Sequence, residues 1–456
     1  MSFDWTTTTL GQICDAQGGA IQTGPFGSQL HTSDYTETGI PVVMPTNIGD
    51  GGIVEDGIAR IAQADVDRLS QHILRLDDIV FSRRGDVTKN ALIRPHEVGW
   101  FCGTGCLKVR LGSGAVADAK FISHCLRLPE TKDWLIRHAV GATMPNLNTG
   151  ILSAVPIFLP PLHVQLDIAA MLGAFDDRIT LLRETNATLE GIAQALFKSW
   201  FVDFDPVRAK MEGRTPEGMD EATAALFPDG LEDSELGLVP KGWQAVRLDD
   251  LCKRYGGSIQ TGPFGSQLHA SDYVETGIPV VMPKDIQNRR AMTDSIARIG
   301  VADADRLSRH KVMAGDIVFS RRGDVEKHAL MTEREVGWIC GTGCLLLRPG
   351  KAWPSATFLS MTLDAPRARV WLVQHAVGAT MPNINTGILG SVPVILPSEA
   401  VLMVFEDVIA ACELQRSHNA STAETLATLR DTLLPRLISG QLRLPQVHQE
   451  LEAALP

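Results

Sequence analysis

The 456-residue sequence lacks the patterns that mark several common classes of protein. No apolar run approaches the roughly 20 residues that a membrane helix needs. The start, MSFDWTTTTL, has neither the basic residues nor the apolar stretch of a secretory signal. Only eight cysteines are present, a number that fits thiols in a reducing compartment. These absences predict a cytoplasmic protein that has no membrane partner.

Motifs of catalysis are also missing. GPFGS is not followed by the Gly-Lys-Ser/Thr of a phosphate loop, and neither His-Glu-x-x-His nor a nucleophile elbow occurs. The Asn/Asp-Pro-Pro-aromatic tetrapeptide of amino-methyltransferases is absent as well. The pairs Cys102/Cys106 and Cys340/Cys344 offer only half of a tetrahedral metal site, so we interpret them as buried thiols. The sequence therefore predicts no catalytic residue, metal or cofactor in this chain, although an acidic nuclease triad would leave no sequence signature.

An excess of basic residues is absent too, because 42 Lys and Arg face 53 Asp and Glu, for a net charge of −11. Duplex DNA repels an acidic surface. A DNA-binding role therefore requires that cations gather on one surface while the acidic residues lie elsewhere. Residues 217–235 are one stretch in which acidic residues accumulate.

One segment of the sequence is present twice. Residues 18–45 read GGAIQTGPFGSQLHTSDYTETGIPVVMP, and residues 256–283 read GGSIQTGPFGSQLHASDYVETGIPVVMP. At an offset of 238, residues 21–107 share 59 identities in 87 aligned positions with their copy. After a one-residue deletion, HAVGATMPNLNTGIL matches HAVGATMPNINTGIL. This period far exceeds the roughly 20–45 residues of a solenoid repeat, so the chain holds two whole domains of one kind.

Each copy has a globular part of about 150 residues and then a helical part. Strand-like runs such as IPVVMP alternate with turn residues, and the proline-bounded VPIFLPP and VPVILPS end the globular parts. From Leu162 onward, apolar residues recur in steps of three and four, as in a heptad seam. The predicted seam residues are Ile168, Leu172, Phe175, Ile179, Leu182, Asn186 and Leu189. Asn186 resembles the buried polar residue that sets the register of a coiled coil.

The matching stretch at about 400–438 is helical but less regular, because Arg416 and Asn419 interrupt its apolar face. The predicted seam residues on that face are Phe405, Ile409, Leu426 and Leu433. Since one such helix follows each globular part, we expect the two helices to pack on each other; the alternative is a core helix within each domain. About 30 helical residues span roughly 45 Å, enough for a spacer. The acidic, Pro- and Gly-punctuated segment 211–240 predicts a connector.

Several phrases carry a resemblance to a known family. They are LPPLHVQLDIAAMLGAFDDRITLLRETNATLEGIAQALFKSWFVDFDPVRAKMEG at 159–213, LGLVPKGW at 236–243 and LRDTLLPRLISGQL at 429–442. With the duplicated architecture, the chain resembles the specificity (S) subunit of type I restriction–modification systems over essentially its whole length. The long phrase is distinctive, whereas the shorter ones alone would be weak.

The resemblance implies an α+β fold: two homologous α/β target-recognition domains separated by two long helices that form an antiparallel coiled coil, with pseudo-twofold symmetry. We expect recognition domains at 1–160 and 241–397, helical arms at 161–205 and 398–445, a connector at 206–240 and a tail at 446–456. The implied partners are double-stranded DNA, two methyltransferase (M) subunits and, in some complexes, two restriction (R) subunits. S-adenosylmethionine, ATP and Mg²⁺ are implied for those partner subunits, and no catalytic centre is implied for this chain.

The chain departs from the family in one respect, because its two recognition domains are close copies where the family generally carries unlike ones. Like readers on a twofold axis should read like half-sites in inverted orientation. The sequence therefore predicts a bipartite, nearly palindromic DNA target.

Three shared segments carry residue types that are suited to reading base edges. Arg and Lys bind guanine, and Asn and Gln bind adenine. We name them the glycine loop (22–31 and 260–269), the arginine loop (82–86 and 320–324) and the asparagine loop (144–149 and 381–386). The candidates in the glycine loops are Gln22, Thr23, Ser28, Gln29, His31, Gln260, Thr261, Ser266, Gln267 and His269. The candidates in or just after the other loops are Arg83, Arg84, Lys89, Asn146, Arg321, Arg322, Lys327 and Asn383. The alternatives are loops packed on their own domains, Arg–Asp pairs within the turn, and ordinary Asn–Pro turn chemistry.

The copies diverge at 46–52 against 284–290, which we name the divergent loop. The candidates here are Asn47, Lys284, Asp285, Arg289 and Arg290. An Asn-to-Asp exchange turns a donor and acceptor into an acceptor only, which would alter base preference at a groove. The added cations would strengthen binding to the DNA backbone. A drifting surface loop is the alternative.

A competing class of function is a non-catalytic adaptor that binds only proteins through its duplicated domains and helices. The acidic net charge favours it, whereas the repeated arginine and glycine loops favour DNA reading. Basic concavities on both domains would discriminate the two.

Overall fold

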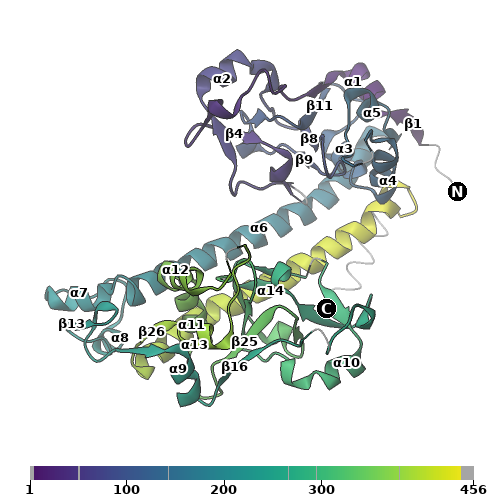
Figure 1. Ribbon diagram of the computed structural model, residues 1–456. Coiled ribbons are helices and arrows are strands. Elements are labelled where there is room, and N and C mark those ends of the chain that lie inside the picture. Colours follow the sequence, from purple (N-terminus) through teal and green to yellow (C-terminus); the bar gives the residue numbers. More distant parts are fainter. Residues whose placement is uncertain are drawn as a thin grey trace. The chain divides into compact units, whose positions relative to one another are not determined.

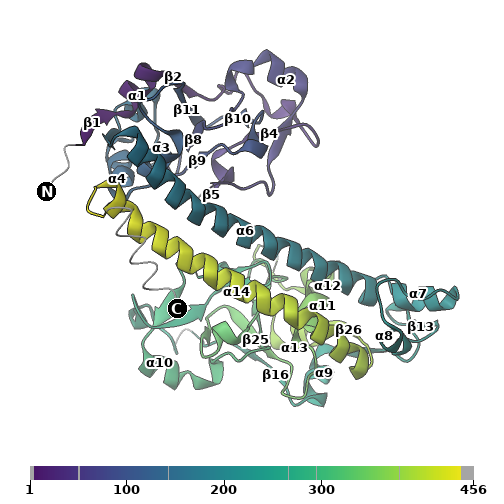
Figure 2. The same cartoon turned by 180° about the vertical axis from the view of Figure 1, so that it is seen from behind.

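The computed structural model describes residues 5–49, 52–141, 143–264, 267–293, 295–378 and 380–442. The expected tail at 446–456 and the candidate Ser266 lie outside these residues. The chain forms two compact units, one made of residues 1–184 with 419–456 and the other of residues 185–418. The boundaries of the units fall within two long helices, α6 (Leu162–Phe201) and α14 (Glu399–Ile438), which Figures 1 and 2 show as continuous ribbons. Each unit thus combines a globular domain with parts of both helices.

The domain of the first unit contains two four-stranded sheets, ordered β2-β11-β8-β9 and β10-β4-β7-β3, and the two-stranded pairs β1-β12 and β5-β6. Its strands are β1 (Thr6–Thr9), β2 (Gly18–Thr23), β3 (Tyr35–Thr36), β4 (Ile40–Val43), β5 (Ile48–Gly49), β6 (Gly52–Ile53), β7 (Ala59–Ile61), β8 (Ile79–Ser82), β9 (Asn90–Leu92), β10 (Phe101–Cys102), β11 (Cys106–Gly112) and β12 (Pro156–Leu159). Its helices are α1 (Leu10–Gln17), α2 (Gln63–Arg68), α3 (Ala119–Cys125), α4 (Pro129–His138) and α5 (Thr149–Ser153).

The domain of the second unit repeats this topology, with sheets ordered β16-β25-β22-β23 and β17-β21-β18-β24 and pairs β15-β26 and β19-β20. Its strands are β15 (Gln244–Arg247), β16 (Ser258–Thr261), β17 (Tyr273–Val274), β18 (Ile278–Val281), β19 (Ile286–Gln287), β20 (Arg290–Ala291), β21 (Ala297–Ile299), β22 (Ile317–Ser320), β23 (His328–Leu330), β24 (Ile339–Cys340), β25 (Cys344–Arg348) and β26 (Pro393–Leu396). Its helices are α9 (Leu248–Arg254), α10 (Val301–Arg306), α11 (Ala356–Asp364), α12 (Pro366–His375) and α13 (Thr386–Gly390).

The apolar runs of the sequence form the central strands. All four residues of β8, IVFS, are buried, as are those of its copy β22. A strand buried on both faces reads as a continuous apolar run, because no side faces water. At the end of β11, the guanidinium of Arg110 donates two hydrogen bonds to the buried carboxylate of Asp78, at 2.7 and 2.5 Å. Arg348 and Asp316 repeat this pair in the second domain, at 2.8 and 2.6 Å.

In the first unit, the start of α6 packs on the end of α14. Leu172 shares an apolar core with Leu433 and Leu437, and further along α6 Ile179 packs in a cluster with Ala423. The residue numbers of the contacts on α14 therefore decrease as those on α6 increase, so the two helices pack antiparallel. The predicted pairing of the helices is confirmed within this unit.

The second unit shows the same antiparallel arrangement between the end of α6 and the start of α14. The rings of Phe201 and Phe405 meet edge to face, with centroids 4.9 Å apart. Asn186 donates a hydrogen bond from its side-chain nitrogen to the carbonyl of Arg416, at 3.0 Å. This contact gives the polar seam residue the interhelical partner that a register-setting position requires.

The predicted seam residues lie on buried or half-buried faces of the two helices. Ile168, Leu172, Ile179, Leu182, Phe405, Ile409 and Leu433 are buried. Phe175 and Leu426 pack half-buried against the cores, and Asn186 and Leu189 have intermediate exposure. The heptad pattern therefore located the packed faces of both helices.

The segment expected to be a connector has secondary structure of its own. It contains α7 (Asp205–Met211), α8 (Glu221–Ala225) and a hairpin of β13 (Leu231–Ser234) and β14 (Gly237–Pro240). Val207 and Phe227 are buried in the core of the second unit, where the ring of Phe227 meets Trp200 at 5.1 Å. Isolated aromatic residues carried no periodic signal, so their burial was not visible in the sequence.

Within the described ranges, no helix is both long and apolar enough to cross a membrane.

Candidate nucleic-acid interface

The three predicted loops of the first domain lie against one another. The guanidinium of Arg83 lies over the ring of Phe26, 5.9 Å from its centroid, which joins the arginine loop to the glycine loop. The backbone N–H of Leu147 donates to the carbonyl of Arg83 at 2.9 Å, and that of Gly85 donates to Pro145 at 3.2 Å. These contacts join the arginine loop to the asparagine loop. Segments more than 50 residues apart in the sequence thus form one loop cluster.

The second domain builds the same loop cluster. The N–H of Ile384 donates to the carbonyl of Arg321 at 3.0 Å, and the N–H of Gly323 donates to Pro382 at 2.9 Å. The backbones of Arg322 and Asn383 form a bridge, as those of Arg84 and Asn146 do in the first domain. The cluster is therefore a property of the shared sequence.

A fourth segment completes each cluster, and its sequence predicted only a pair of buried thiols. It is the cysteine loop, residues 102–106 and 340–344. The N–H of Arg83 donates to Gly105 at 2.8 Å and that of Gly24 donates to Cys106 at 2.9 Å. A Cβ on Gly24 would lie 2.1 Å from the carbonyl oxygen of Gly103, so only glycine permits this approach. The shared Gly-Thr-Gly was the signal that could have identified this contact.

The cysteines of this loop are buried thiols, as interpreted from their sequence. Cys106 donates its S–H to the carbonyl of Val43 at 3.3 Å, and Cys344 repeats the contact with Val281 at 3.4 Å. Burial raises the pKa of Cys102 to about 12, with smaller opposing and reinforcing effects of Lys108 and Asp78. Among the described residues no group of three or more His, Cys, Asp or Glu could hold a metal ion.

The outer side of each cluster carries both cations and apolar groups. Arg84 and Lys89 are exposed in the first domain, as are Arg322 and Lys327 in the second. Lys327 pairs with Asp324 at 2.5 Å. The neighbouring apolar side chains that remain exposed are Phe26, Val140 and Met144, with Phe264, Val377 and Met381 as their copies. Cations that bind phosphates beside apolar groups that contact bases form the combination used by DNA-reading surfaces.

The remaining glycine-loop candidates divide into exposed and structural side chains. Ser28, His31 and His269 are exposed. Gln29 accepts the N–H of Phe26 at 3.0 Å through its side-chain oxygen, and Gln267 accepts that of Phe264 at 3.1 Å. The two glutamines therefore fold the loop.

The candidates at the strand ends are half-buried. Gln22 and Thr23 end β2, and Gln260 and Thr261 end β16. Gln260 donates its side-chain amide to the carbonyl of Arg309 at 2.6 Å.

The half-buried arginines and asparagines of the clusters retain unsatisfied polar atoms. The Nε atoms of Arg83 and Arg321 and the side-chain oxygen of Asn146 are buried without a hydrogen-bond partner. Asn383 is half-buried at the matching position. Buried polar atoms are seldom left unpaired, so these positions are suited to a partner that binds the cluster.

Asn47 and its counterpart Asp285 do not present their side chains to a DNA groove. Asn47 is 5% exposed; its side-chain oxygen accepts the N–H of Met44 at 3.0 Å and its amide donates to Val54 at 3.2 Å. Asp285 is 3% exposed and accepts the N–H of Met282 at 3.0 Å. Burial raises the pKa of the Asp285 carboxyl. Both side chains cap a turn, so the prediction that they contact bases is wrong for this structure.

The cations of the divergent loop also differ from expectation. Arg289 pairs with Glu190 on α6, and Arg290 pairs with Glu413 on α14 at 2.8 Å. The prediction that both strengthen binding to the DNA backbone is contradicted, because their charges are committed to helix carboxylates. Lys284 remains exposed and donates to the carbonyl of Ser295 at 3.3 Å.

Comparison with known proteins matches this arrangement. Residues 3–191 match the family model of the type I restriction modification DNA specificity domain. The chain is 28% identical to the HindI specificity subunit of Haemophilus influenzae over 68% of this chain and 73% of that protein. It is 22% identical to the MjaIX specificity subunit of Methanocaldococcus jannaschii over 97% of this chain and 95% of that protein. A crystal structure of a type I S subunit from M. genitalium shares the fold, at a TM-score of 0.55 and 16% identity over 95% of this chain and 96% of that one.

The matched model ends at residue 191, but the second domain repeats the sequence and topology of the first. The chain is therefore similar, over both of its domains, to the specificity subunits of type I restriction–modification systems.

Proposed function

We propose that this chain reads a bipartite DNA site, with one half-site contacted by each loop cluster. The observation that carries the proposal is the repeated cluster, whose loops carry the exposed Arg84 and Arg322 together with the exposed Phe26 and Phe264. Arginine binds guanine edges with two hydrogen bonds or clamps a phosphate, and the glycines allow the backbone to approach DNA closely.

The half-sites are expected to be alike and inverted. The two clusters share their loops residue for residue at nearly every position, so they present the same groups to DNA. Like readers carried on antiparallel arms read like half-sites in opposite orientation, as the subunits of a dimeric repressor do on a palindrome.

The chemistry of modification belongs to partner subunits in this proposal. Two methyltransferase subunits bind S-adenosylmethionine and methylate one adenine in each half-site, and restriction subunits that use ATP and Mg²⁺ join some complexes. The helix pair and the domain surfaces next to it are the proposed assembly site. No catalytic role is assigned to this chain.

Sequencing of methylated bases in cells that express the chain with its methyltransferase partner tests the proposal. The expected result is methyladenine within two spaced, inverted and similar half-sites. Loss of the chain should abolish this methylation, and restoring it should bring the same sites back. Modified sites that lack the two similar halves would overturn the reading.

A protein-binding adaptor is the second candidate, and the net charge of −11 favours it. It predicts that the assembled complex binds cognate and unrelated duplexes equally weakly. A preference for the methylated sequence, measured by competition between duplexes, would exclude the adaptor.

A further inference from the structure

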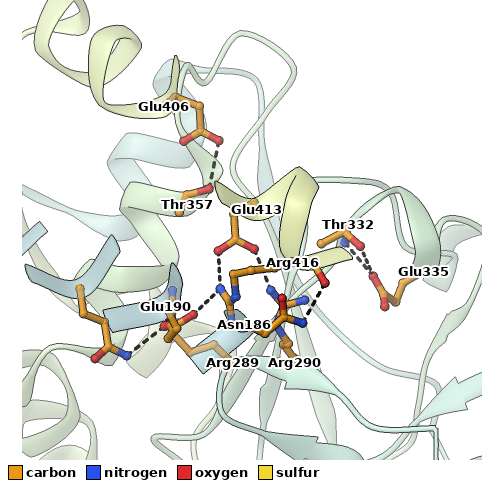
Figure 3. A network of polar contacts seen from close by, with 11 residues as sticks. Asn186, Glu190, Arg289, Arg290, Thr332, Glu335, Thr357, Glu406, Glu413 and Arg416 are labelled. Carbon is orange, nitrogen blue, oxygen red and sulfur yellow. Dashed lines mark hydrogen bonds and ion pairs between the residues drawn. The ribbon is translucent and has the colours of Figure 1, made fainter. Parts of the chain in front are cut away.

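Five charged side chains form a network between the second recognition domain and the helices of its own unit (Figure 3). Arg289 comes from the turn between β19 and β20, and Arg290 is the first residue of β20. Glu190 comes from α6, and Glu413 and Arg416 come from α14. Arg289 and Arg416 each pair with Glu190, Arg290 pairs with Glu413 at 2.8 Å, and Arg416 pairs with Glu413 at 2.6 Å. We name this network the arginine latch.

Two arginines of the arginine latch are largely removed from water, whereas Arg290 is 34% exposed. The side chains of Arg289 and Arg416 are each 9% exposed. Burial alone would raise the pKa of Glu190, but Arg289 and Arg416 more than offset this effect and hold the pKa below its ordinary value. Charge pairs attract more strongly where water is excluded. The latch therefore acts as a specific attachment, unlike an exposed ion pair.

The turn that supplies the arginines has an unusual backbone. Asn288 and Arg289 have φ angles of 47° and 59°, in the left-handed region that non-glycine residues seldom occupy. Residues held in this region require support from their surroundings. The ion pairs of Arg289 supply such support, and a glycine at the matching position of the first domain would not need it.

The first domain is attached by other residues. Arg127, from the turn after α3, pairs with Asp176 on α6 at 2.7 Å, and Asp176 also accepts Arg430 of α14 at 2.5 Å. Aligned across the deletion, Arg127 corresponds to Asp364 and Asp176 to Glu413. The charge at the domain position is therefore reversed between the two copies.

The place of Arg289 is also different in the first domain. Arg289 extends toward Asp364, with its Nε atom 3.9 Å from the carboxylate. The matching region of the first domain is a pocket whose lining includes Gly49, Arg127 and Lys132. At the position of Asp364, the first domain thus has a cation, Arg127, in the lining of this pocket.

We propose that the arginine latch fixes the second recognition domain at one specific position on the helix pair. In this proposal the divergent loop evolved to attach the domain and not to read bases. The Arg127–Asp176–Arg430 contact fixes the position of the first domain in the same way. A second domain placed on the helix surface of the first would set Asp364 against Asp176, and like charges that face each other disfavour the wrong partner. Two nearly identical readers are thereby held at non-equivalent positions.

The consequence for DNA rests on the proposed function, because a domain held in one orientation presents its loop cluster at a defined distance from the other half-site. The attachment itself does not depend on DNA. An experiment on the free chain therefore separates failure of the latch from failure of the proposed function.

The test replaces residues 284–290 of the full chain by the sequence of 46–52, which changes Lys284→Thr, Asp285→Asn, Gln287→Gly, Asn288→Asp, Arg289→Gly and Arg290→Gly. Hydrogen exchange should accelerate at least tenfold in β19, β20 and the facing segments 186–194 and 409–418, with no change in the first domain. Selection of bound duplexes from a random pool, carried out with the assembled complex, should return the same bases in both half-sites.

Matched variants keep the test decisive. Lys284→Thr alone changes an exposed cation of the same loop and should leave exchange unchanged. Arg289→Lys with Arg290→Lys retains the charges and should restore most of the protection that Arg289→Gly with Arg290→Gly removes. The double glycine variant also serves if the seven-residue replacement fails to fold. Unchanged hydrogen exchange in the double glycine variant would overturn the proposal. Altered base preference in that variant or in the seven-residue replacement would overturn it as well.

Discussion

Arg84 and Arg322 stand at the exposed turn of their arginine loops, while Arg83 and Arg321 beside them are half-buried. The alternation follows from the ends of β8 and β22, where successive side chains point to opposite sides. The inner arginine organises the cluster, since Arg83 lies over Phe26 and its carbonyl accepts Leu147. The outer arginine is the one available to DNA.

Replacing Arg84 and Arg322 together by Ala should weaken specific binding by more than about tenfold, because each good base contact contributes roughly 1–3 kcal/mol. Titration of the assembled complex with its cognate duplex measures the change. Lys351→Ala, which removes an exposed cation outside the loop clusters and both long helices, is the matched control. Full affinity in a folded double variant would remove both arginines from the reading surface.

At the scale of the element, α6 and α14 separate their buried seam from their exposed faces sharply. Leu182 is 6% exposed, whereas the adjacent Leu181 is 50% exposed. Leu172 is fully buried against the end of α14. Apolar contacts build most of the seam. Asn186 and the buried Asn419 are polar positions of the helix pair, which also carries carboxylate–arginine contacts.

Leu172→Glu and Leu182→Glu should each destabilise the first unit by at least about 3 kcal/mol, because a large apolar side chain is lost and a charge is buried. Leu181→Glu makes the same change on the exposed face of α6 and should have little effect on stability. Chemical denaturation measures stability, and gel filtration with the methyltransferase measures assembly. A helix pair that tolerates both seam variants in folding and assembly would contradict this role.

At the scale of the whole molecule, both units bury a neutral histidine. Burial lowers the pKa of His124 to about 3 in the first unit, with Arg127 adding to the effect, and that of His328 to about 3 in the second, with Arg289 adding to it. His328 is hydrogen-bonded through Nε2 to Ser360, 3.0 Å from its hydroxyl. The two units thus share a dependence on pH. His124 and His328 occupy different positions, whereas burial also lowers the pKa values of His72 and His310 at matching positions.

The free energy of unfolding should fall as the pH drops below about 6.5, the ordinary pKa of histidine. The unfolded chain takes up protons there while the folded imidazoles stay neutral until about pH 3, so stability that is present above pH 6.5 is lost on acidification. Chemical denaturation between about pH 7.5 and about pH 4.5, a range around that pKa, measures how the free energy of unfolding changes with pH.

His124→Met with His328→Asn takes the residue of the other copy at each position. This double variant should reduce the pH dependence, and His72 and His310, whose pKa values burial also lowers, should retain the remainder. An unchanged slope would show that the histidines do not titrate on unfolding in this range.

The duplication, the strand-rich domains and the packed faces of the helices followed from the sequence alone. They rest on local patterns: identity at a constant offset, apolar runs, and recurrence every three or four residues. A local pattern reports which side of an element is buried, and so Ile168 and Leu172 were identified before any partner was known. The loops rich in glycine and arginine were also recognised from a local pattern, their repeated composition.

Tertiary structure decided where the polar side chains point. Arg289 and Arg290 meet carboxylates 99 and 123 residues away, and Asn47 turns inward to cap its own turn. A charged or amide group is equally suited to water, DNA or an ion pair, so its residue type does not reveal its partner. The folded chain brings those partners together, and so the ion pairs of Arg289 and Arg290 became visible only in the tertiary structure.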